Sequence, residues 1–290
     1  MRQAILVGLI GANIQKSLSP AMFEDACAAL GIAGHYHLMD LDCLPGRSLP
    51  DLLAAARTAG FAGVNVTFPC KEAVLPLLDE VSAEAREIGA VNTVTIDAVG
   101  RTVGHNTDRT GFRRSVEETI GRDRVEGRQA VLVGAGGAGR AVAFALFDLG
   151  LKRLLVSDRN ATQADGLAAA VGRHRCEIVA DPAAALAQSV GLVNATPVGM
   201  AGGLPGLPVS PDAVRREHWL ADVIYTPLET ELVLMARARG AVAMGGSGMC
   251  VHQAVETFRL FTGRTTDLAR MQATFAAAAA RRGDVRAAAD

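Results

Sequence analysis

The stretch that decides the fold is AVLVGAGGAGRAVAFALFDLGLKRLLVSD, residues 130–158. Its first residues, 130–133, are apolar, which is typical of a short strand that is buried on both faces of a sheet. A glycine-rich turn follows at once, then an apolar helical segment over 140–149 that Gly150 ends, then a second strand over 154–157. A Gly-x-Gly-x-x-Gly turn between a strand and a helix predicts a dinucleotide-binding fold.

The glycines of this turn have separate expected roles. We expect Gly134 to allow a sharp turn, Gly136 to let the backbone approach a pyrophosphate, and Gly139 to let helix and strand pack closely. The helix N-terminus adds N–H groups and a positive dipole end for the phosphates. The alternative is an ordinary tight turn. The candidate phosphate-binding residues are Gly134, Ala135, Gly136, Gly137, Ala138 and Gly139.

Asp158 bears on the choice of cofactor. It ends the second strand, 19 residues after Gly139, where a carboxylate can accept hydrogen bonds from a ribose 2′-hydroxyl and repel a 2′-phosphate. This favours NAD over NADP. The neighbouring Arg159 can pair with a 2′-phosphate, so NADP remains the alternative.

Strands and helices alternate through the second half of the chain, which predicts a parallel sheet covered on both faces. Further strands there are expected at 177–180, 191–194, 220–225 and 241–244, and helices at 162–171, 182–189 and 229–239. In the first half we expect strands at 4–10, 35–39 and 63–67, a hairpin of 91–96 with 101–105, a helix at 51–59, and short helical pieces at 71–78 and 82–88. Another helix is expected to open with Ser19 as N-cap and Pro20 as its first residue. The chain ends in helices at 249–261 and 267–280.

Composition excludes several classes of protein. The 290 residues carry 29 basic and 30 acidic side chains, and the basic cluster of Arg281, Arg282 and Arg286 is too small to predict nucleic-acid binding. No uncharged apolar run reaches about 18 residues, so no membrane-spanning helix is expected, and the first residues read as a strand and not as a signal peptide. The 5 cysteines form no Cys-x-x-Cys pair and no metal-binding spacing, which indicates a reduced, cytoplasmic protein with no metal site.

Short polar segments follow the apolar strands of the first half. They are 17–20 (SLSP), 65–71 (NVTFPCK), 90–93 (AVNT) and 106–108 (NTD). Ligands of open α/β sheets bind beyond the carboxyl ends of the strands, so these segments predict a site for a small polyhydroxylated molecule. Each segment also has a local interpretation, as a helix cap, a turn or a solvated lysine.

These segments, with GAGGAG, NATP (194–197), DVIY (222–225) and the late G-M-x-x-x-Q (248–253), resemble the shikimate dehydrogenase family in their order along nearly the whole chain. GHNTD (104–108), HWLADVIYTPLETEL (218–232) and VHQAVETFRLFTG (251–263) look most like its quinate/shikimate branch. The resemblance implies an NAD-dependent enzyme that oxidises the C3 hydroxyl of shikimate, quinate or both.

The resemblance also implies an α/β fold of two domains. Residues 1–108 form the substrate-binding and catalytic domain, to which the C-terminal helices, 247–290, return. Residues 109–246 form an NAD-binding Rossmann domain with a doubly wound parallel sheet. The small-molecule substrate and NAD are the expected partners, nucleic acid and membrane are not, and the family allows a monomer or a homodimer.

Site residues carry over by position. Lys71 matches the family's catalytic lysine, which exchanges a proton with the substrate hydroxyl, and Asp108 matches the aspartate that orients it. Asn65 is expected to shape its loop. The positions that match substrate contacts are Ser17, Ser19, Thr67, Asn92, Tyr225 and Gln253. Beyond the glycine turn, the positions that match cofactor contacts are Asp158, Arg159, Thr196 and Gly248.

Several positions depart from the family pattern. Ser19 stands where quinate-type enzymes often have Thr, Phe68 and Cys70 stand where His and Tyr are common, and Gly245 replaces an acidic residue. Besides the NAD-dependent dehydrogenase, three other functions stay open. They are an NADP-dependent biosynthetic enzyme that reduces 3-dehydroshikimate, a dehydrogenase for an aminated ring such as aminoshikimate, and an NAD-sensing module without catalysis.

Overall fold

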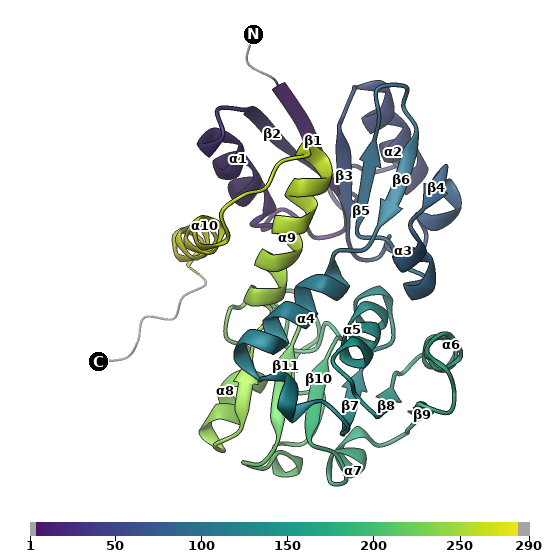
Figure 1. Cartoon of the computed structure of the whole chain (residues 1–290), viewed down its shortest axis with the longest axis vertical. Coiled ribbons are helices and arrows are strands. Elements are labelled where there is room, and N and C mark those ends of the chain that lie inside the picture. The colour runs from purple at the N-terminus through teal and green to yellow at the C-terminus, as the bar shows by residue number, and fades with distance from the viewer. Residues whose placement is uncertain (1–3, 284–290) are drawn as a thin grey trace. The chain divides into compact units, whose positions relative to one another are not determined.

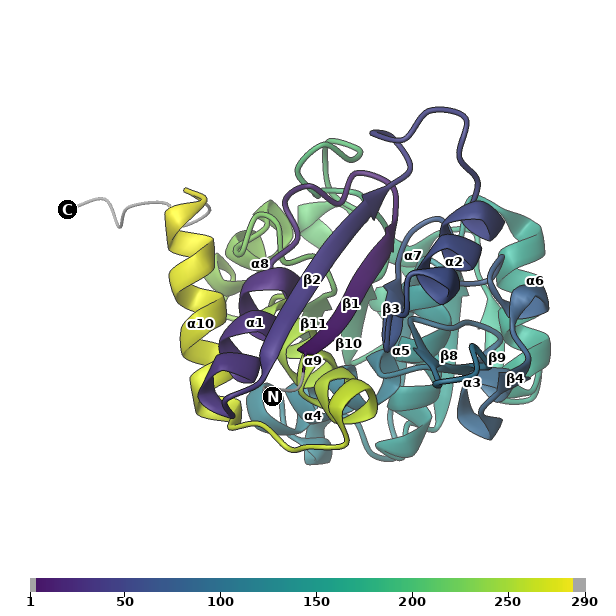
Figure 2. The same cartoon turned by 90° about the horizontal axis from the view of Figure 1, so that it is seen from above.

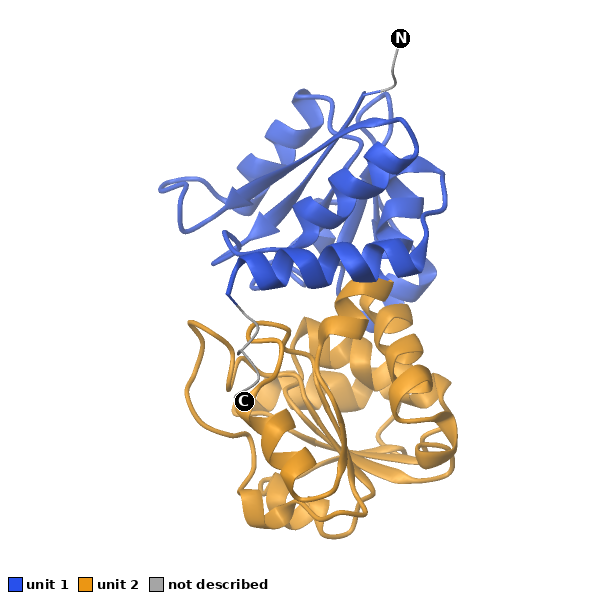
Figure 3. Cartoon of the chain, turned by 90° about the vertical axis from the view of Figure 1, so that its left-hand side faces the viewer, with its two compact units in different colours: residues 1–107, 253–283 blue, residues 108–252, 284–290 orange. Residues whose placement is uncertain are grey.

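The computed structural model describes residues 4–283, which divide into two compact units, coloured separately in Figure 3. Within the described residues, unit 1 comprises 4–107 and 253–283, and unit 2 comprises 108–252. The last part of the C-terminal segment, 284–290, and Arg286 of the basic cluster lie outside the described residues.

Unit 1 contains a mixed six-stranded sheet in the order β2-β1-β3-β5-β6-β4. Its strands are β1 (Ala4–Gly11), β2 (Ala33–Asp40), β3 (Gly63–Val66), β4 (Glu80–Val81), β5 (Thr93–Ile96) and β6 (Thr102–His105). β1 pairs in parallel with β2 and β3, whereas β5 runs antiparallel to both β3 and β6. The carboxyl ends of β1 and β3 therefore meet at one edge of this sheet, and the segments that follow them start there.

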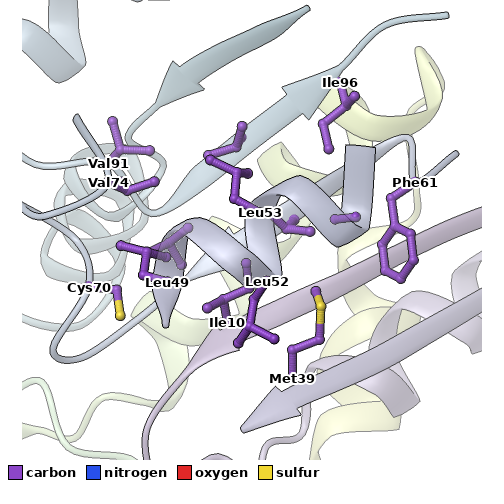
Figure 4. Packing of buried hydrophobic residues seen from close by; sticks show 14 of the residues in the cluster. Ile10, Met39, Leu49, Leu52, Leu53, Phe61, Cys70, Val74, Val91 and Ile96 are labelled. Carbon is purple, nitrogen blue, oxygen red and sulfur yellow. The ribbon is translucent and has the colours of Figure 1, made fainter. Parts of the chain in front are cut away.

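Alternation along the strands gives the two faces of this sheet different chemistry. Val64 and Val66 of β3, with Val94 of β5, join the apolar cluster beneath α2 (Leu49–Thr58), which Figure 4 shows from close by. Asn65 lies between Val64 and Val66, and its partner Thr93 precedes Val94, so both side chains point to the opposite face. One face of the sheet thus holds hydrocarbon and the other holds buried polar groups.

The opposite face is covered by α1 (Ser19–Ala29) and by the part of α9 (Ser247–Thr262) that belongs to unit 1, and α10 (Leu268–Arg281) packs against α1. Phe23 of α1 packs its ring 5.6 Å from that of Phe258 and 5.8 Å from that of Tyr36. Arg270 of α10 donates to both carboxylate oxygens of Asp25 in α1, and the two helices lie side by side in Figures 1 and 2. Distant parts of the chain thereby close over the polar face.

Unit 2 contains a six-stranded sheet whose pairs are all parallel, in the order β12-β11-β10-β7-β8-β9. Its strands are β7 (Gln129–Val133), β8 (Arg153–Ser157), β9 (Cys176–Ile178), β10 (Gly191–Asn194), β11 (Trp219–Asp222) and β12 (Val242–Met244). Its helices are α4 (Asp108–Thr119), α5 (Gly137–Asp148), α6 (Ala161–Val171), α7 (Pro182–Leu186) and α8 (Glu231–Ala238). From the centre of the sheet, β7, β8 and β9 follow one another toward one edge, and β10, β11 and β12 follow one another toward the other edge. This is the strand order of the Rossmann fold and confirms the predicted α/β class.

Two local predictions were wrong. Leu18, and not Ser19, is the N-cap of α1, so Ser19 is the first helical residue and the side chain of the N-cap residue makes no capping bond. The predicted helical piece at 71–78 consists of turns and a single 3₁₀ turn at Leu75–Leu77, and the short strand β4 was not predicted. The remaining pieces of unit 1 are α3 (Ala83–Ile88) and the loops that connect the strands.

Within residues 4–283, no helix has both the length and the apolar character needed to cross a bilayer. All 5 cysteines are present as free thiols, with only Cys43 exposed.

Candidate active site

The glycine turn of unit 2 is shaped by close backbone contacts. Gly134 has φ +102°, and a Cβ there would lie 2.6 Å from the Ala195 carbonyl oxygen. A Cβ at Gly139 would lie 2.0 Å from the Gly134 carbonyl oxygen, so helix α5 can approach β7 only because this residue is glycine. A Cβ at Gly136 would meet no described atom within 4 Å. The space beside Gly136 is therefore not filled by the protein. Gly136 is the N-cap of α5, and the N-terminus of a helix favours a phosphate group.

Asp158 lies at the carboxyl end of β8 and contacts this turn directly. Its Oδ2 accepts a hydrogen bond from the Ala135 N–H at 2.7 Å, and its Oδ1 accepts one from the Asn160 N–H at 2.7 Å. A carboxylate oxygen has room for a second donor, so these bonds are compatible with a ribose hydroxyl. The sequence predicted a role of Asp158 toward the ribose, and the structure adds a role in shaping the phosphate turn. Arg159 beside it is exposed.

Two loops at the same edge of this sheet are joined through a buried carboxylate that the sequence analysis missed. Asp222, at the end of β11, accepts from the Thr230 hydroxyl at 2.7 Å and from the Asn194 side-chain amide at 3.1 Å. Asn194, at the end of β10, in turn accepts from the Thr196 hydroxyl at 2.6 Å. The loop that carries the predicted cofactor contact Thr196 is therefore fixed to the loop that carries Tyr225.

The environment of Asp222 is unusual for a carboxyl group. Its side chain is fully buried, and this burial raises its pKa to about 6, although the hydrogen bonds from Thr230, the Ile224 N–H and Asn194 act to lower it. The sequence signal that could have located it is the polar residue at the end of a strand in DVIY, since Asn194 holds the equivalent place in the neighbouring strand.

In unit 1, the segment that holds Ser17 is organised by Asp40 at the end of β2. The carboxylate of Asp40 accepts from the Ile14 N–H at 3.0 Å and from the Gln15 side-chain amide at 3.0 Å. Burial alone would raise its pKa, but the hydrogen bonds of Gln15 and of nearby backbone N–H groups outweigh that effect, and the pKa is lowered. Ser17 Oγ then accepts from the Ser19 N–H at 3.3 Å, so the two serines lie together at the start of α1.

Thr67 and Lys71 lie in the loop that follows β3. The Thr67 N–H donates to the Ile10 carbonyl at 3.0 Å, which keeps this loop beside the end of β1. The Lys71 carbonyl accepts from the Val91 N–H at 2.8 Å, so Lys71 lies close in space to the start of the AVNT segment. Lys71 is half-buried.

Asn92 fixes the NTD segment. Its Oδ1 accepts from the Thr107 N–H at 2.8 Å and its Nδ2 donates to the Thr107 hydroxyl at 2.9 Å. Asp108, buried, follows Thr107 in the chain and is the first residue of α4 in unit 2. Three polar segments that are far apart in the sequence, those of Asn65, Asn92 and Thr107, are thus linked by hydrogen bonds within unit 1.

A small pocket lies over the polar face of the unit 1 sheet. It contains two of the predicted substrate contacts, Ser19 and Gln253, beside Asn65. Its complete lining is Ser19, Phe23, Tyr36, Asn65, Gln253, Ala254, Thr257, Phe258 and Met271. Uncharged hydrogen-bonding groups here lie against aromatic and thioether carbon.

The remaining predicted residues belong to unit 2. Tyr225 is half-buried in the loop after β11. Gly248 lies in the first turn of α9, and a Cβ there would lie 2.3 Å from the Ser115 Oγ of α4, so this glycine is required for the packing of the two helices. Within residues 4–283, no three His, Cys, Asp or Glu side chains gather as a metal site would require.

Comparisons with known proteins find a family match, similar sequences and similar solved structures. Residues 9–94 match the family described as the shikimate dehydrogenase substrate binding domain. The chain is 47% identical over 280 residues to a quinate/shikimate dehydrogenase (NAD(+)) of Corynebacterium efficiens, which covers 94% of this chain and 98% of that protein. It is similar to the solved structure of quinate dehydrogenase from Corynebacterium glutamicum in complex with NAD, with a TM-score of 0.87, 44% identity and coverage of 95% of this chain and 100% of that one. It is also similar to shikimate 5-dehydrogenase from Thermus thermophilus in complex with NADP(H) and shikimate, with a TM-score of 0.81, 37% identity and coverage of 94% and 99%.

Proposed function

The chain belongs to the shikimate dehydrogenase family, and we propose that it is an NAD-dependent dehydrogenase that oxidises the ring C3 hydroxyl of shikimate, quinate or both. The products are 3-dehydroshikimate and 3-dehydroquinate, and the reaction is reversible. The observation that carries this proposal is the open space at Gly136 with the Asp158 carboxylate bonded to the same turn. The space at Gly136 can receive a pyrophosphate, and the Asp158 carboxylate can accept from a free ribose 2′-hydroxyl. Together they suit a dinucleotide such as NAD.

Unit 2 is the proposed cofactor domain. The turn Gly134–Gly139 and the N-terminus of α5 would hold the pyrophosphate, and Asp158 would accept from the ribose. Thr196 and Gly248 complete the proposed cofactor contacts. When bound, the nicotinamide supplies a hydride acceptor for the carbinol carbon.

Unit 1 is the proposed substrate domain, and Lys71 is its proposed proton carrier. During oxidation the Lys71 amine takes the proton of the C3 hydroxyl, and in the reverse direction its ammonium donates a proton to the ketone oxygen. Asp108 is proposed to orient Lys71 and to accept from a ring hydroxyl. A positioned acid–base group of this kind contributes about 10²–10⁴-fold to the rate.

The substrate carboxylate is proposed to bind at the start of α1. The hydroxyls of Ser17 and Ser19 would donate to it, and the positive end of the helix dipole favours an anion there. Pro20 has no N–H, so the serine hydroxyls must supply donors that the helix backbone lacks at this residue. Thr67, Asn92, Tyr225 and Gln253 are the proposed contacts to the remaining oxygens of the ring.

A second candidate is an NADP-dependent biosynthetic enzyme that reduces 3-dehydroshikimate. The observation that favours it is Arg159, whose exposed side chain stands next to Asp158 and could pair with a 2′-phosphate. Initial rates with shikimate and quinate, each with NAD and with NADP, separate the two functions. We expect the highest kcat/KM with NAD, and a clear NADP preference would reject the NAD assignment. Absence of turnover in all four combinations would reject both dehydrogenase functions.

We also propose a cytoplasmic location, which the five free thiols support because disulfides are rare in that compartment. Small molecules are the proposed partners, and the chain is proposed to act as a monomer or a homodimer. Gel filtration with light scattering measures its oligomeric state.

A further inference from the structure

Asn194, the last residue of β10, carries a fully buried side chain that holds the following loop of unit 2. Its Nδ2 donates to the Val198 carbonyl at 3.1 Å and to Asp222 Oδ1 at 3.1 Å. Its Oδ1 accepts from the Thr196 N–H at 3.1 Å and from the Thr196 hydroxyl at 2.6 Å. One amide thus joins both sides of the loop to the end of the neighbouring strand β11.

Backbone groups decide which way the Asn194 amide faces. A backbone carbonyl can only accept and a backbone N–H can only donate, so the Val198 carbonyl requires the NH₂ group and the Thr196 N–H requires the oxygen. The reversed amide would lose both bonds in a buried place, which is costly. Asp222 favours the same orientation, because its Oδ1 is an acceptor that also receives the Ile224 N–H at 3.1 Å.

This orientation of Asn194 determines the direction of the Thr196 hydroxyl. The hydroxyl oxygen accepts from the Val198 N–H at 3.2 Å, and its hydrogen is directed to Asn194 Oδ1, which can only accept. A hydroxyl has one hydrogen and two lone pairs. The hydrogen and one lone pair are used by these two bonds, so the second lone pair makes the hydroxyl an acceptor toward a ligand.

Thr196 lies beside the glycine turn. A Cβ at Gly134 would lie 3.0 Å from the Thr196 methyl carbon and 2.6 Å from the Ala195 carbonyl oxygen. The Ala195 N–H donates to the Val133 carbonyl at 2.7 Å, which fastens the start of the loop to the end of β7. Thr196 is half-buried, so a ligand held by the glycine turn has this side chain as a neighbour.

We propose that Asn194 is a positioning residue for the cofactor: it directs the Thr196 hydroxyl so that Thr196 accepts a hydrogen bond from the bound dinucleotide. This inference rests on the proposed function for the identity of that dinucleotide. Asn194 is buried and acts through Thr196, while Asp222 holds the other end of its amide. The recognised group must carry a donor hydrogen, as a ribose hydroxyl and the carboxamide NH₂ of nicotinamide do. An ionised phosphate has only acceptor oxygens and does not fit.

The decisive experiment is a double-mutant cycle on NAD binding, measured by calorimetric titration without substrate. Thr196→Val removes the accepting oxygen and Asn194→Ala removes the group that directs it, so each should raise the Kd for NAD about tenfold. The double variant should bind at most about threefold more weakly than Thr196→Val alone, because Asn194 acts through Thr196. Thr196→Ser keeps the hydroxyl and should restore the wild-type Kd.

Ser189→Ala is the matched control near the opposite end of β10. The Ser189 side chain is buried and its hydroxyl donates to the Ala185 carbonyl at 3.0 Å, so this variant also loses a buried hydrogen bond. It should lower the free energy of unfolding and leave the Kd for NAD within about twofold of wild type. If Asn194→Ala does not fold, Asn194→Ser keeps a polar group that is too short to join Thr196 to Asp222 and carries the same expectations.

A cofactor analogue distinguishes the two donors. In 3-acetylpyridine adenine dinucleotide a methyl group replaces the carboxamide NH₂ of NAD. An effect of Thr196→Val that disappears with this analogue identifies the carboxamide as the donor, and an effect that persists identifies a ribose hydroxyl.

The outcomes separate this inference from the proposed function. Wild-type protein that turns over neither shikimate nor quinate, but binds NAD and shows the expected cycle, rejects the proposed function and supports the positioning role. Active wild-type protein with an unchanged Kd for NAD in Asn194→Ala or in Thr196→Val overturns the positioning role. An effect of Asn194→Ala that is equally large with and without Thr196→Val also overturns it, because Asn194 would then act through the fold and not through Thr196.

Discussion

Asp222 offers a direct test of the arrangement of unit 2, because a buried carboxylate there responds to pH in a calculable way. Burial raises its pKa to about 6 from the ordinary value of 3.8. A difference of about two units corresponds to about 3 kcal/mol between the protonation states. The folded protein therefore holds this proton more tightly than the unfolded chain does, so Asp222 contributes most to stability below about pH 4, and that contribution is lost as the pH rises through about 6.

The perturbation is Asp222→Asn, which removes the titration while keeping a side chain of similar shape. Between pH 7 and pH 5 the wild-type protein should gain about 1 kcal/mol of stability from this group, and the variant should not. The free energies of unfolding of both proteins are measured in urea at pH 7 and at pH 5. The wild-type value minus the variant value should be about 1 kcal/mol larger at pH 5 than at pH 7. Loss of cooperativity in either protein is checked by following fluorescence and circular dichroism together.

A spectroscopic assay tests the same reasoning at the atom concerned. The ¹³C signal of the Asp222 carboxyl, identified by its absence in Asp222→Asn, should titrate with a midpoint near 6. Thr230→Val removes a donor that stabilises the carboxylate and should move the midpoint higher. A midpoint near 4 in the wild-type protein, or no movement in Thr230→Val, would refute the burial and bonding described for this residue.

Three further variants test the sites separately. Lys71→Ala should lower kcat about 10²–10⁴-fold and leave the affinity for NAD unchanged in a direct binding titration, and activity within a few fold of wild type would exclude Lys71 as the proton carrier. Asp158→Asn should lower the ratio of kcat/KM with NAD to kcat/KM with NADP. This ratio is compared because any disturbance of the bond to the Ala135 N–H affects both cofactors alike. Tyr36→Phe removes the donor to Asn65 Oδ1 and should lower the free energy of unfolding by about 1 kcal/mol in urea, so equal stability would show that the Asn65 oxygen finds another donor.

The sequence was sufficient for the parts of the fold that depend on neighbouring residues. The glycine turn is local at Gly139, where a Cβ would meet the Gly134 carbonyl oxygen, but Gly134 is also required by a distant residue, since a Cβ there would meet the carbonyl oxygen of Ala195. The N-cap of α1 was misplaced for a physical reason: Pro20 is tolerated in the second helical position as well as the first, so Ser-Pro alone does not say which residue begins the helix. The 71–78 segment has helical composition, yet it forms only turns and one 3₁₀ turn after the cis Phe68–Pro69 bond.

The buried contact between Asn65 and Thr257 shows where sequence reasoning stops. The alternation of Asn65 with Val64 and Val66 does assign Asn65 to the face opposite the apolar core, and the spacing of four residues does place Thr257 and Gln253 on one face of a helix. Neither pattern says that these two faces meet, because Asn65 and Thr257 are 192 residues apart and the contact depends on how α9 packs over β3. Gly63 in β3 leaves room for that packing, since a Cβ there would lie 2.4 Å from the Phe261 ring and 2.5 Å from the Val94 carbonyl oxygen. A glycine of β3 is therefore required both by the neighbouring strand and by a helix that is distant in the sequence, and the second requirement becomes visible only once the helix and the strand are seen together.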